Sequence, residues 1–218
     1  MGRTLAPFAG HDHGISVFGF GDSTTGDWTV FSLNEEKDCE NLEEVLSVYN
    51  RMTPNIDLSG PTNFAPLIYR AMEICQQRRD YHILVIIADG QVTNEKATVK
   101  AIVSACQFPL SIIVVGIFDE SLPKRPWDNF HFVELHELIN QRADQPIESR
   151  ELAFAVHSLL EIPDQYATIR KMGLLSSTAF FTRPPSHSPR RSKSPKAAQK
   201  INGTTADDEG AQEKETNC

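Results

Sequence analysis

Two uninterrupted apolar segments constrain the fold of this 218-residue chain more than any other feature. They read YHILVIIA at residues 81–88 and LSIIVVGI at residues 110–117. A strand with no polar side has both faces covered, which is typical of a parallel sheet between two layers of helices. We therefore expect the alternating side chains of both segments to be buried, in particular Ile83, Val85, Ile87, Ile112 and Val114.

Four other segments carry apolar residues at the three- and four-residue spacing of an amphipathic helix. They are residues 41–52, 62–77, 94–107 and 149–162. Ser149 is expected to cap the last of these helices, and Pro163 to end it. In the first helix the expected buried face consists of Leu42, Val45, Leu46 and Tyr49.

Shorter β-rich segments complete the pattern. ISVFGF at residues 15–20 is followed by WTVFSL at residues 28–33, which we interpret as its hairpin partner, and residues 130–135 form a last strand. Strands that alternate with helices predict an α/β fold with a doubly wound, mostly parallel, Rossmann-like sheet. We assign this domain to residues 1–175 and expect the Ser-, Pro- and Lys-rich residues 176–218 to be disordered.

Two polar residues lie where such a sheet binds ligands, at the carboxyl ends of its strands. Thr62 lies in a Gly-Pro turn at the start of a helix, and Asp89 follows the first apolar segment. A hydroxyl and a carboxylate are hard oxygen ligands suited to Mg²⁺. From these two residues alone a structural interpretation is favoured, with Thr62 as a helix cap and Asp89 as a turn residue. Asp22 ends the 15–20 strand at the same edge, as a further candidate ligand or as a turn residue.

Six segments, in order, resemble the copine-type von Willebrand factor A domain, as found in plant-style RING-domain ubiquitin ligases. They are FGFGD, LSGPTNFAPLI, YHILVIIADGQVTN, PLSIIVVGI, DNFHFVEL and LAFAVHSLLEIPDQY, and the resemblance runs from about Gly2 to about Met172. It implies a metal-ion-dependent adhesion site in which Thr62 and Asp89 hold Mg²⁺. It also implies that a protein partner completes the coordination with an acidic side chain.

The chain departs from that family pattern at the metal site. By the resemblance, the first, central strand and its Asp-x-Ser-x-Ser loop would precede Met1, so most metal ligands are missing. The loss would also leave a gap between the strands at 15–20 and 81–88. We therefore expect a degenerate site that binds Mg²⁺ weakly or not at all. Neither the paired C2 domains of copines nor the roughly eight Cys and His ligands of a RING are present.

These observations favour a non-catalytic protein–protein interaction module of the copine type. The alternative hypothesis is that the chain is part of a RING-type E3 ubiquitin ligase family member, which keeps the substrate-binding part and lacks the RING. A third hypothesis is a truncated product without a stable fold. Relatives with a RING are enzymes, but no nucleophile with its base is visible in this chain, so the sequence does not support catalysis.

The amino-acid composition limits the kinds of partner and the cellular compartments that are compatible with this chain. The formal net charge of −8 argues against nucleic acid as a partner. No apolar segment reaches the about 18 residues that a membrane span requires. Cys75 and Cys106 lie on apolar helical faces, which predicts buried reduced thiols and a cytoplasmic location. The basic segment at residues 189–196 is compatible with the nucleus as well.

Overall fold

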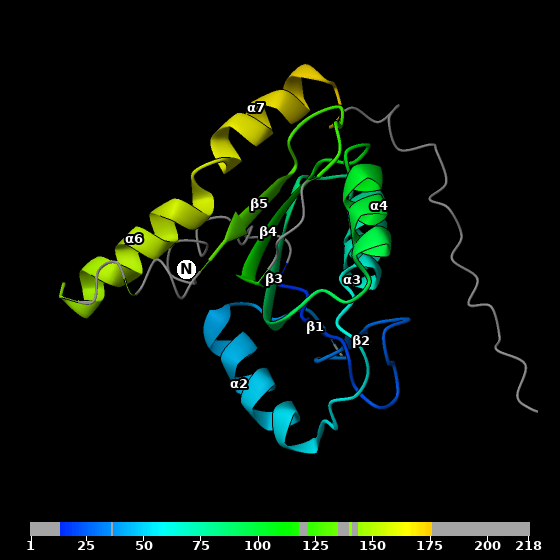
Figure 1. Cartoon of the computed structure of the whole chain (residues 1–218), viewed down its shortest axis with the longest axis vertical. Coiled ribbons are helices and arrows are strands. Elements are labelled where there is room, and N and C mark those ends of the chain that lie inside the picture. The colour runs from blue at the N-terminus through cyan, green and yellow to red at the C-terminus, as the bar shows by residue number, and fades with distance from the viewer. Residues whose placement is uncertain (1–13, 36, 118–121, 135–139, 141–143, 176–218) are drawn as a thin grey trace, which may run out of the picture. The chain divides into compact units, whose positions relative to one another are not determined.

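The computed structural model describes residues 14–35, 37–117, 122–134, 140 and 144–175. The expected disorder of residues 176–218 lies outside this range. Figure 1 shows the elements, which in chain order are β1 (Phe18–Gly19), β2 (Phe31–Ser32), α2 (Leu42–Met52), η2 (Thr53–Asn55), α3 (Ala65–Arg78), β3 (His82–Gln91), α4 (Glu95–Ala105), β4 (Leu110–Ile117), β5 (Phe130–Val133), α6 (Ile147–Leu159) and α7 (Ile162–Lys171).

A three-stranded parallel sheet with the order β3-β4-β5 forms the centre of the domain. His82 pairs with Leu110 at one end of β3, and the register continues without a break to Ile87 opposite Val115. Strand β5 joins the other side of β4, with Phe130 opposite Ile112. The predicted parallel α/β sheet is confirmed, and β3 lies at its edge.

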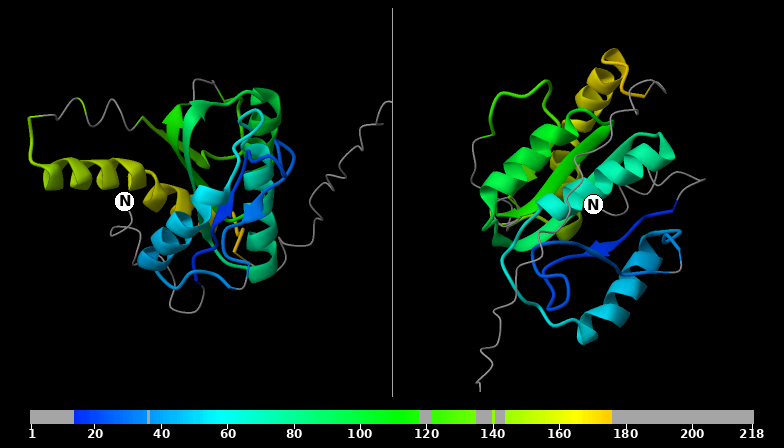
Figure 2. Two further views of the ribbon diagram at one scale, coloured as in Figure 1. Left: turned by 90° about the horizontal axis from the view of Figure 1, so that it is seen from below. Right: turned by 90° about the vertical axis from the view of Figure 1, so that its right-hand side faces the viewer.

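The two faces of this sheet pack against different helices, as the alternation of side chains along a strand requires. On one face, Leu84, Ile86, Ile112 and Val114 lie in a cluster with residues of α3 and α4. On the other face the strands contact α6 and α7, through Ile83, Val85, Ile113 and Val115 packed against Phe154, Leu159 and Ile162. Figures 1 and 2 show these helices on opposite sides of the strands, which confirms the doubly wound arrangement.

The burial predictions hold for the central strand and fail in part for the edge strand. Ile112 and Val114 are fully buried, as expected. Ile83 and Val85 are only half-buried, and the prediction for Ile87 is wrong, because 73% of this residue is exposed. The difference follows from position, since β4 has a strand on either side whereas β3, within the described residues, pairs with β4 alone.

Strands β1 and β2 form a separate antiparallel sheet, as the predicted hairpin requires, with Phe18 opposite Ser32. Helix α2 packs against this hairpin through a cluster that includes Leu33, Cys39 and Val48. The expected buried face of α2 is therefore wrong in part. Leu46 and Tyr49 are exposed. Val45 contacts the hairpin cluster as expected, and Val48 and Met52 contact it in place of the two exposed residues.

The last predicted helix is two helices in the structure. Helix α6 starts after Pro146 rather than at Ser149, so the expected cap is wrong. It ends at Leu159, and a second helix, α7, begins at Ile162 with Pro163 in its first turn. Proline fits there because the first N–H groups of a helix have no intrahelical partner. Pro163 thus helps to start a helix that the sequence pattern did not predict.

Three cysteines lie in the apolar interior as free thiols. Cys75 and Cys106 are buried as predicted, and Cys39 is buried as well. Burial raises the pKa of the Cys75 thiol to about 12, so this side chain behaves as a small apolar group. Among the described helices, none is both long enough and apolar enough to cross a membrane.

Candidate functional site

Two loops and the end of β3 meet at the carboxyl edge of the sheet and position the predicted site residues. Loop 21–27 is joined to loop 57–63, because the Ser23 N–H donates to the Asp57 carbonyl at 2.7 Å and the Ser59 N–H to the Gly21 carbonyl at 2.8 Å. The second loop is joined in turn to the end of β3. Gly60 has a φ of +94° within that loop, a conformation that favours glycine.

Thr62 is held by its backbone, and its hydroxyl does not cap a helix. The Thr93 N–H and hydroxyl both donate to the Thr62 carbonyl, at 2.9 and 3.0 Å. Helix α3 begins at Ala65, whose N–H donates to the Asn63 Oδ1 at 3.0 Å, while the Asn63 amide donates to the Asp27 carbonyl at 3.0 Å. The N-cap residue of α3 is Phe64, and Asn63, rather than Thr62, supplies the side-chain acceptor for the first N–H of the helix. An asparagine shortly before Pro66 was the signal for it.

Asp89 lies at the same edge, one residue before the point where β3 approaches Thr62. It is exposed, and it belongs to β3, which continues to Gln91 although its pairing with β4 shifts between Ile87 and Gln91. A Cβ atom on the next residue, Gly90, would lie 3.4 Å from the Thr62 Oγ1. The loop before α3 therefore passes the end of β3 at Gly90, and because side chains of successive strand residues point to opposite faces, this contact does not itself bring the Asp89 carboxylate to Thr62.

Asp22 is engaged in its own turn. Its carboxylate accepts hydrogen bonds from the Thr24 hydroxyl at 2.6 Å, from the Thr25 N–H at 2.8 Å and from the Thr25 hydroxyl. The side-chain hydrogen bonds from Thr24 and then Thr25 lower the pKa of Asp22 from 3.8 to about 2. This geometry favours the turn role over the ligand role, because both carboxylate oxygens already have donors.

This arrangement predicts that the stability contributed by Asp22 depends on pH. A carboxyl group with a lowered folded-state pKa stabilises the fold above its ordinary pKa of 3.8, and that contribution is lost as pH falls through about 2. We expect Asp22→Asn to be less stable than the parent chain at about pH 6, with the difference shrinking towards pH 2. Urea denaturation of both chains at several pH values measures it. A difference that stays constant with pH would contradict the assigned hydrogen bonds.

The predicted ligands at this edge offer few oxygen donors to a metal ion. Among the described residues there is no group of three or more His, Cys, Asp or Glu side chains that could hold a metal ion. The Thr62 hydroxyl and the Asp89 carboxylate remain as two oxygen donors. Mg²⁺ requires nearly octahedral oxygen coordination, so these two residues alone do not fit it.

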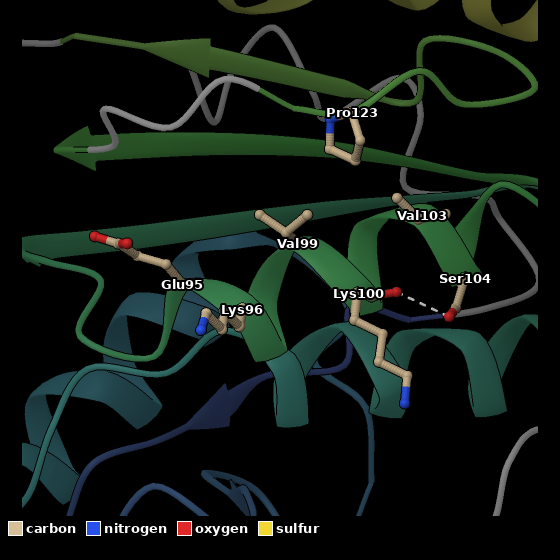
Figure 3. Close-up of a pocket in the computed structure, with 7 residues that line it drawn as sticks. All are labelled: Glu95, Lys96, Val99, Lys100, Val103, Ser104 and Pro123. Carbon is tan, nitrogen blue, oxygen red and sulfur yellow. Dashed lines mark hydrogen bonds between the residues drawn. The ribbon is translucent and has the colours of Figure 1, made fainter.

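A surface depression of about 490 Å³ lies along α4, away from these loops (Figure 3). Its lining combines apolar side chains, among them Val99 and Val103, with the charged Lys96 and Lys100. The Ser104 hydroxyl donates to the Lys100 carbonyl at 2.8 Å, an ordinary bond within a helix. The residues that line it include no histidine and no cysteine.

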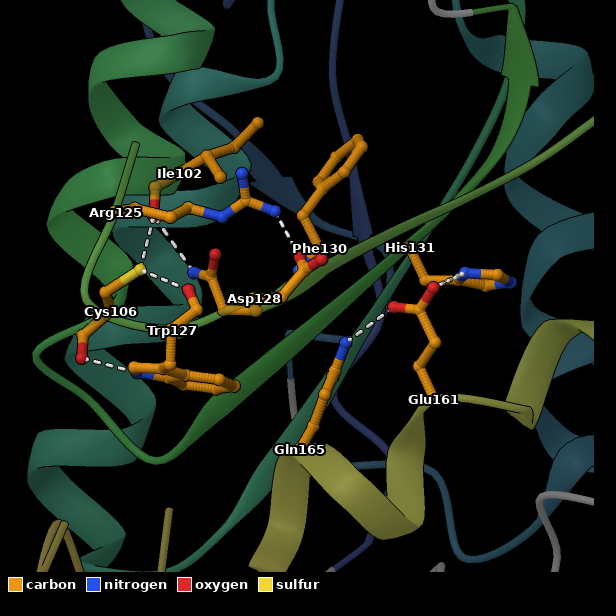
Figure 4. A network of polar contacts seen from close by, with 10 residues as sticks. Ile102, Cys106, Arg125, Trp127, Asp128, Phe130, His131, Glu161 and Gln165 are labelled. Carbon is orange, nitrogen blue, oxygen red and sulfur yellow. Dashed lines mark hydrogen bonds and ion pairs between the residues drawn. The ribbon is translucent and has the colours of Figure 1, made fainter. Parts of the chain in front are cut away.

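A polar network ties β5 to the two last helices (Figure 4). His131 is 8% exposed; its Nδ1 lies 2.9 Å from a Glu161 carboxylate oxygen, and its Nε2 lies 2.9 Å from the His157 carbonyl. The other oxygen of Glu161 accepts from the Gln165 amide at 3.2 Å. These contacts pair the polar groups of buried side chains, so the network serves to hold α6 and α7 on the sheet.

Comparison with known proteins identifies the family to which this chain belongs. The sequence matches the copine family over residues 1–178. The chain belongs to the copine family. It is 64% identical over 186 residues to Copine family protein 1 of Caenorhabditis elegans, in an alignment that covers 80% of this chain and 16% of that protein. The copine resemblance inferred from sequence motifs is thereby confirmed.

Copine relatives also include proteins named as ubiquitin ligases. The chain is 41% identical over 214 residues to E3 ubiquitin-protein ligase RGLG4 of Arabidopsis thaliana, covering 85% of this chain and 53% of the relative. To Copine-E of Dictyostelium discoideum it is 31% identical over 198 residues, covering 83% and 33%. The copine chain thus spans about half or less of the length of these relatives.

Proposed function

We propose that this copine chain is a non-catalytic protein–protein interaction module of the von Willebrand factor A type. Its partner would bind at the edge formed by Thr62 and Asp89, with a degenerate metal-ion-dependent adhesion site. The observation that carries the proposal is the approach of the Thr62 loop to the end of β3, beside Asp89. The edge keeps the position of a family binding site while lacking the ligands for a metal of its own.

The partner that suits this edge is a protein that offers an acidic side chain. In the described part of the chain the Thr62 hydroxyl has no hydrogen-bond partner, so it is available to donate to a carboxylate. The Asp89 carboxylate and the net charge of −8 repel an acidic side chain of the partner. Binding should therefore be weak, and it should strengthen when added salt screens this repulsion. The same charge disfavours nucleic acid. Free buried cysteines suit the cytoplasm and nucleus, where we place the module.

Capture of partners by immobilised variants tests the proposal. Thr62→Val keeps the shape of the side chain and removes the hydroxyl, and Ser47→Ala removes an exposed hydroxyl on α2 as the matched control. We expect partners retained by the parent and by Ser47→Ala to be lost from Thr62→Val by about tenfold, equivalent to 1.4 kcal/mol. Addition of EDTA should leave their capture unchanged. The same partners on all three proteins would exclude this edge as the binding surface.

A role in protein ubiquitination is the alternative, favoured by the 41% identity to a protein named as an E3 ligase. In that case the chain would serve substrate binding, while a RING would come from elsewhere. Incubation of the purified chain with E1, E2, ubiquitin and ATP separates the two functions. We expect no ubiquitin conjugates above the reaction without the chain, whereas conjugates that depend on the chain would favour the ligase.

A further inference from the structure

His131 is a buried histidine whose two ring nitrogens both face hydrogen-bond acceptors. It lies on β5, and its Nδ1 lies 2.9 Å from the Glu161 Oε1 (Figure 4). Its Nε2 lies 2.9 Å from the His157 carbonyl oxygen. A neutral imidazole carries one N–H and can donate to only one of two acceptors, whereas an imidazolium carries two. The contacts are therefore those of a charged histidine.

Glu161 supplies the opposite charge. Its Oε1 faces the ring of His131, and its Oε2 accepts from the Gln165 amide at 3.2 Å. The Glu161 side chain is 39% exposed, whereas that of His131 is 10% exposed. Donors at both oxygens together with contact with water are the surroundings of a carboxylate rather than of a carboxylic acid. The contact is thus an ion pair in which the histidine is the buried partner.

The two charges lie between the ends of two helices. His157 belongs to the last turn of α6, and Glu161 is the N-cap residue of α7. The carboxyl end of a helix favours a cation and the amino end favours an anion. His131 and Glu161 each lie at the helix end that suits their charge. One side chain of β5 therefore contacts the end of α6 and the start of α7 together.

Each element packed against His131 contributes a neighbour of a different kind. Strand β4 places the apolar Ile113 opposite it, and α7 adds the neutral Gln165 beyond Glu161. Helix α6 adds the exposed imidazole of His157, whose ring centroid lies 5.5 Å from that of His131. Two charged rings at this distance repel each other. The His157 ring thus opposes a charge on His131, while the His157 backbone carbonyl favours it.

We propose that His131 is a pH-sensitive latch that holds the junction of α6 and α7 on the sheet. Loss of one proton from its ring removes one of the two hydrogen bonds and, with it, the charge pair. The helices would then be held at this junction by apolar packing alone. The face that they cover carries Ile113, Val115 and Val133, so release of the latch loosens the cover over an apolar surface of the sheet.

The direction of this pH effect is opposite to that of the Asp22 turn. A histidine that gains acceptors on folding contributes its full stabilisation at acidic pH, and the contribution is lost as pH rises. The change falls within the range in which histidine titrates in proteins, about pH 5 to pH 8. The junction of α6 and α7 should therefore be closed at the acidic end of this range and loosened at the alkaline end.

Ring nitrogen resonances of the ¹⁵N-labelled full chain test the charge directly. At about pH 6.5, the ordinary midpoint of histidine, both ring nitrogens of His131 should carry a proton. The spectrum of His131→Gln identifies these resonances by their loss. A single protonated nitrogen on His131 at this pH would overturn the proposal, because one of the two acceptors would then lack its hydrogen bond.

Hydrogen exchange in the same chain measures the opening of the junction. The Gln165 N–H donates to the Glu161 carbonyl at 2.9 Å in the first turn of α7, so its protection reports on this site. Protection is the exchange rate of the unstructured peptide divided by that of the chain at the same pH. Between about pH 6 and pH 8 we expect it to fall about tenfold, the loss of one charge-assisted hydrogen bond. The Ile112 amide on β4 should change by less than about twofold.

A pair of histidine substitutions separates the latch from a general effect of pH. His131→Gln removes the titrating ring, so the Gln165 amide should show the same low protection at both pH values. His157→Gln is the matched control, because it removes an exposed ring and keeps the backbone carbonyl that His131 contacts. It should retain the fall seen in the parent chain. Protection that is independent of pH in the parent, or an equal fall in His131→Gln, would overturn the proposal.

Discussion

Replacing Phe64 with alanine should lower the free energy of unfolding by about 3–5 kcal/mol. Phe64 is fully buried and precedes the first turn of α3. Its ring packs edge-on against Phe20, with centroids 5.9 Å apart, so it joins the hairpin segment to the core of the parallel sheet. Truncation removes a large apolar side chain and leaves a cavity where two parts of the fold meet.

Truncation of an exposed aromatic residue serves as the control, because it shows whether removal of any aromatic side chain lowers stability as much as removal of Phe64. Trp28 is 77% exposed, so Trp28→Ala should change the free energy of unfolding by no more than about 0.5 kcal/mol. Urea denaturation followed by far-UV circular dichroism measures both. Equal effects in the two variants would show that Phe64 does not hold the hairpin and the sheet together.

Replacing Trp127 with alanine should also cost about 3–5 kcal/mol. The side chain is 6% exposed and packs with Cys106, at the end of α4, and with Ile169 of α7. Its indole N–H donates to the Cys106 carbonyl at 2.8 Å (Figure 4). The variant therefore loses apolar burial and leaves a buried carbonyl without its donor.

Trp127→Phe separates these two contributions. It keeps much of the apolar volume but removes the indole donor, so we expect a smaller loss of about 1–3 kcal/mol. Chemical denaturation of the two variants gives both values. A phenylalanine variant as unstable as the alanine variant would assign the stability to the hydrogen bond rather than to packing.

The sequence predicted the parallel sheet well, because a continuous apolar segment has a single physical explanation, a strand that is covered on both faces. Two apolar segments without a polar side require covered strands, and β3 and β4 are the paired parallel strands that result. The same pattern failed for Ile87, because apolar residues show what a strand can bury and not whether a neighbour is present. Among the described residues no strand pairs with the other side of β3, and Ile87 is exposed on that strand.

Local polar contacts were predicted less well than strand positions. The approach of Thr62 to the end of β3 follows from topology, because a loop before a helix and the end of a parallel strand meet at one edge. The hydrogen bond that Asn63 accepts before α3 and the turn around Asp22 depend on which of several nearby polar side chains forms the hydrogen bond. The Asp22-Ser23-Thr24-Thr25 sequence did carry a signal for that turn, since aspartate accepts hydrogen bonds from residues shortly after it.

Calorimetric titration of the purified chain with Mg²⁺ tests the degenerate site, which is central to the proposed function. Two oxygen donors, Thr62 and Asp89, should bind the ion too weakly to detect. We therefore predict no binding heat beyond that of dilution, at metal concentrations up to the millimolar range, for the parent chain and for Asp89→Ala alike. Saturable binding by the parent chain that disappears in Asp89→Ala would contradict the account and would indicate a working metal-dependent site.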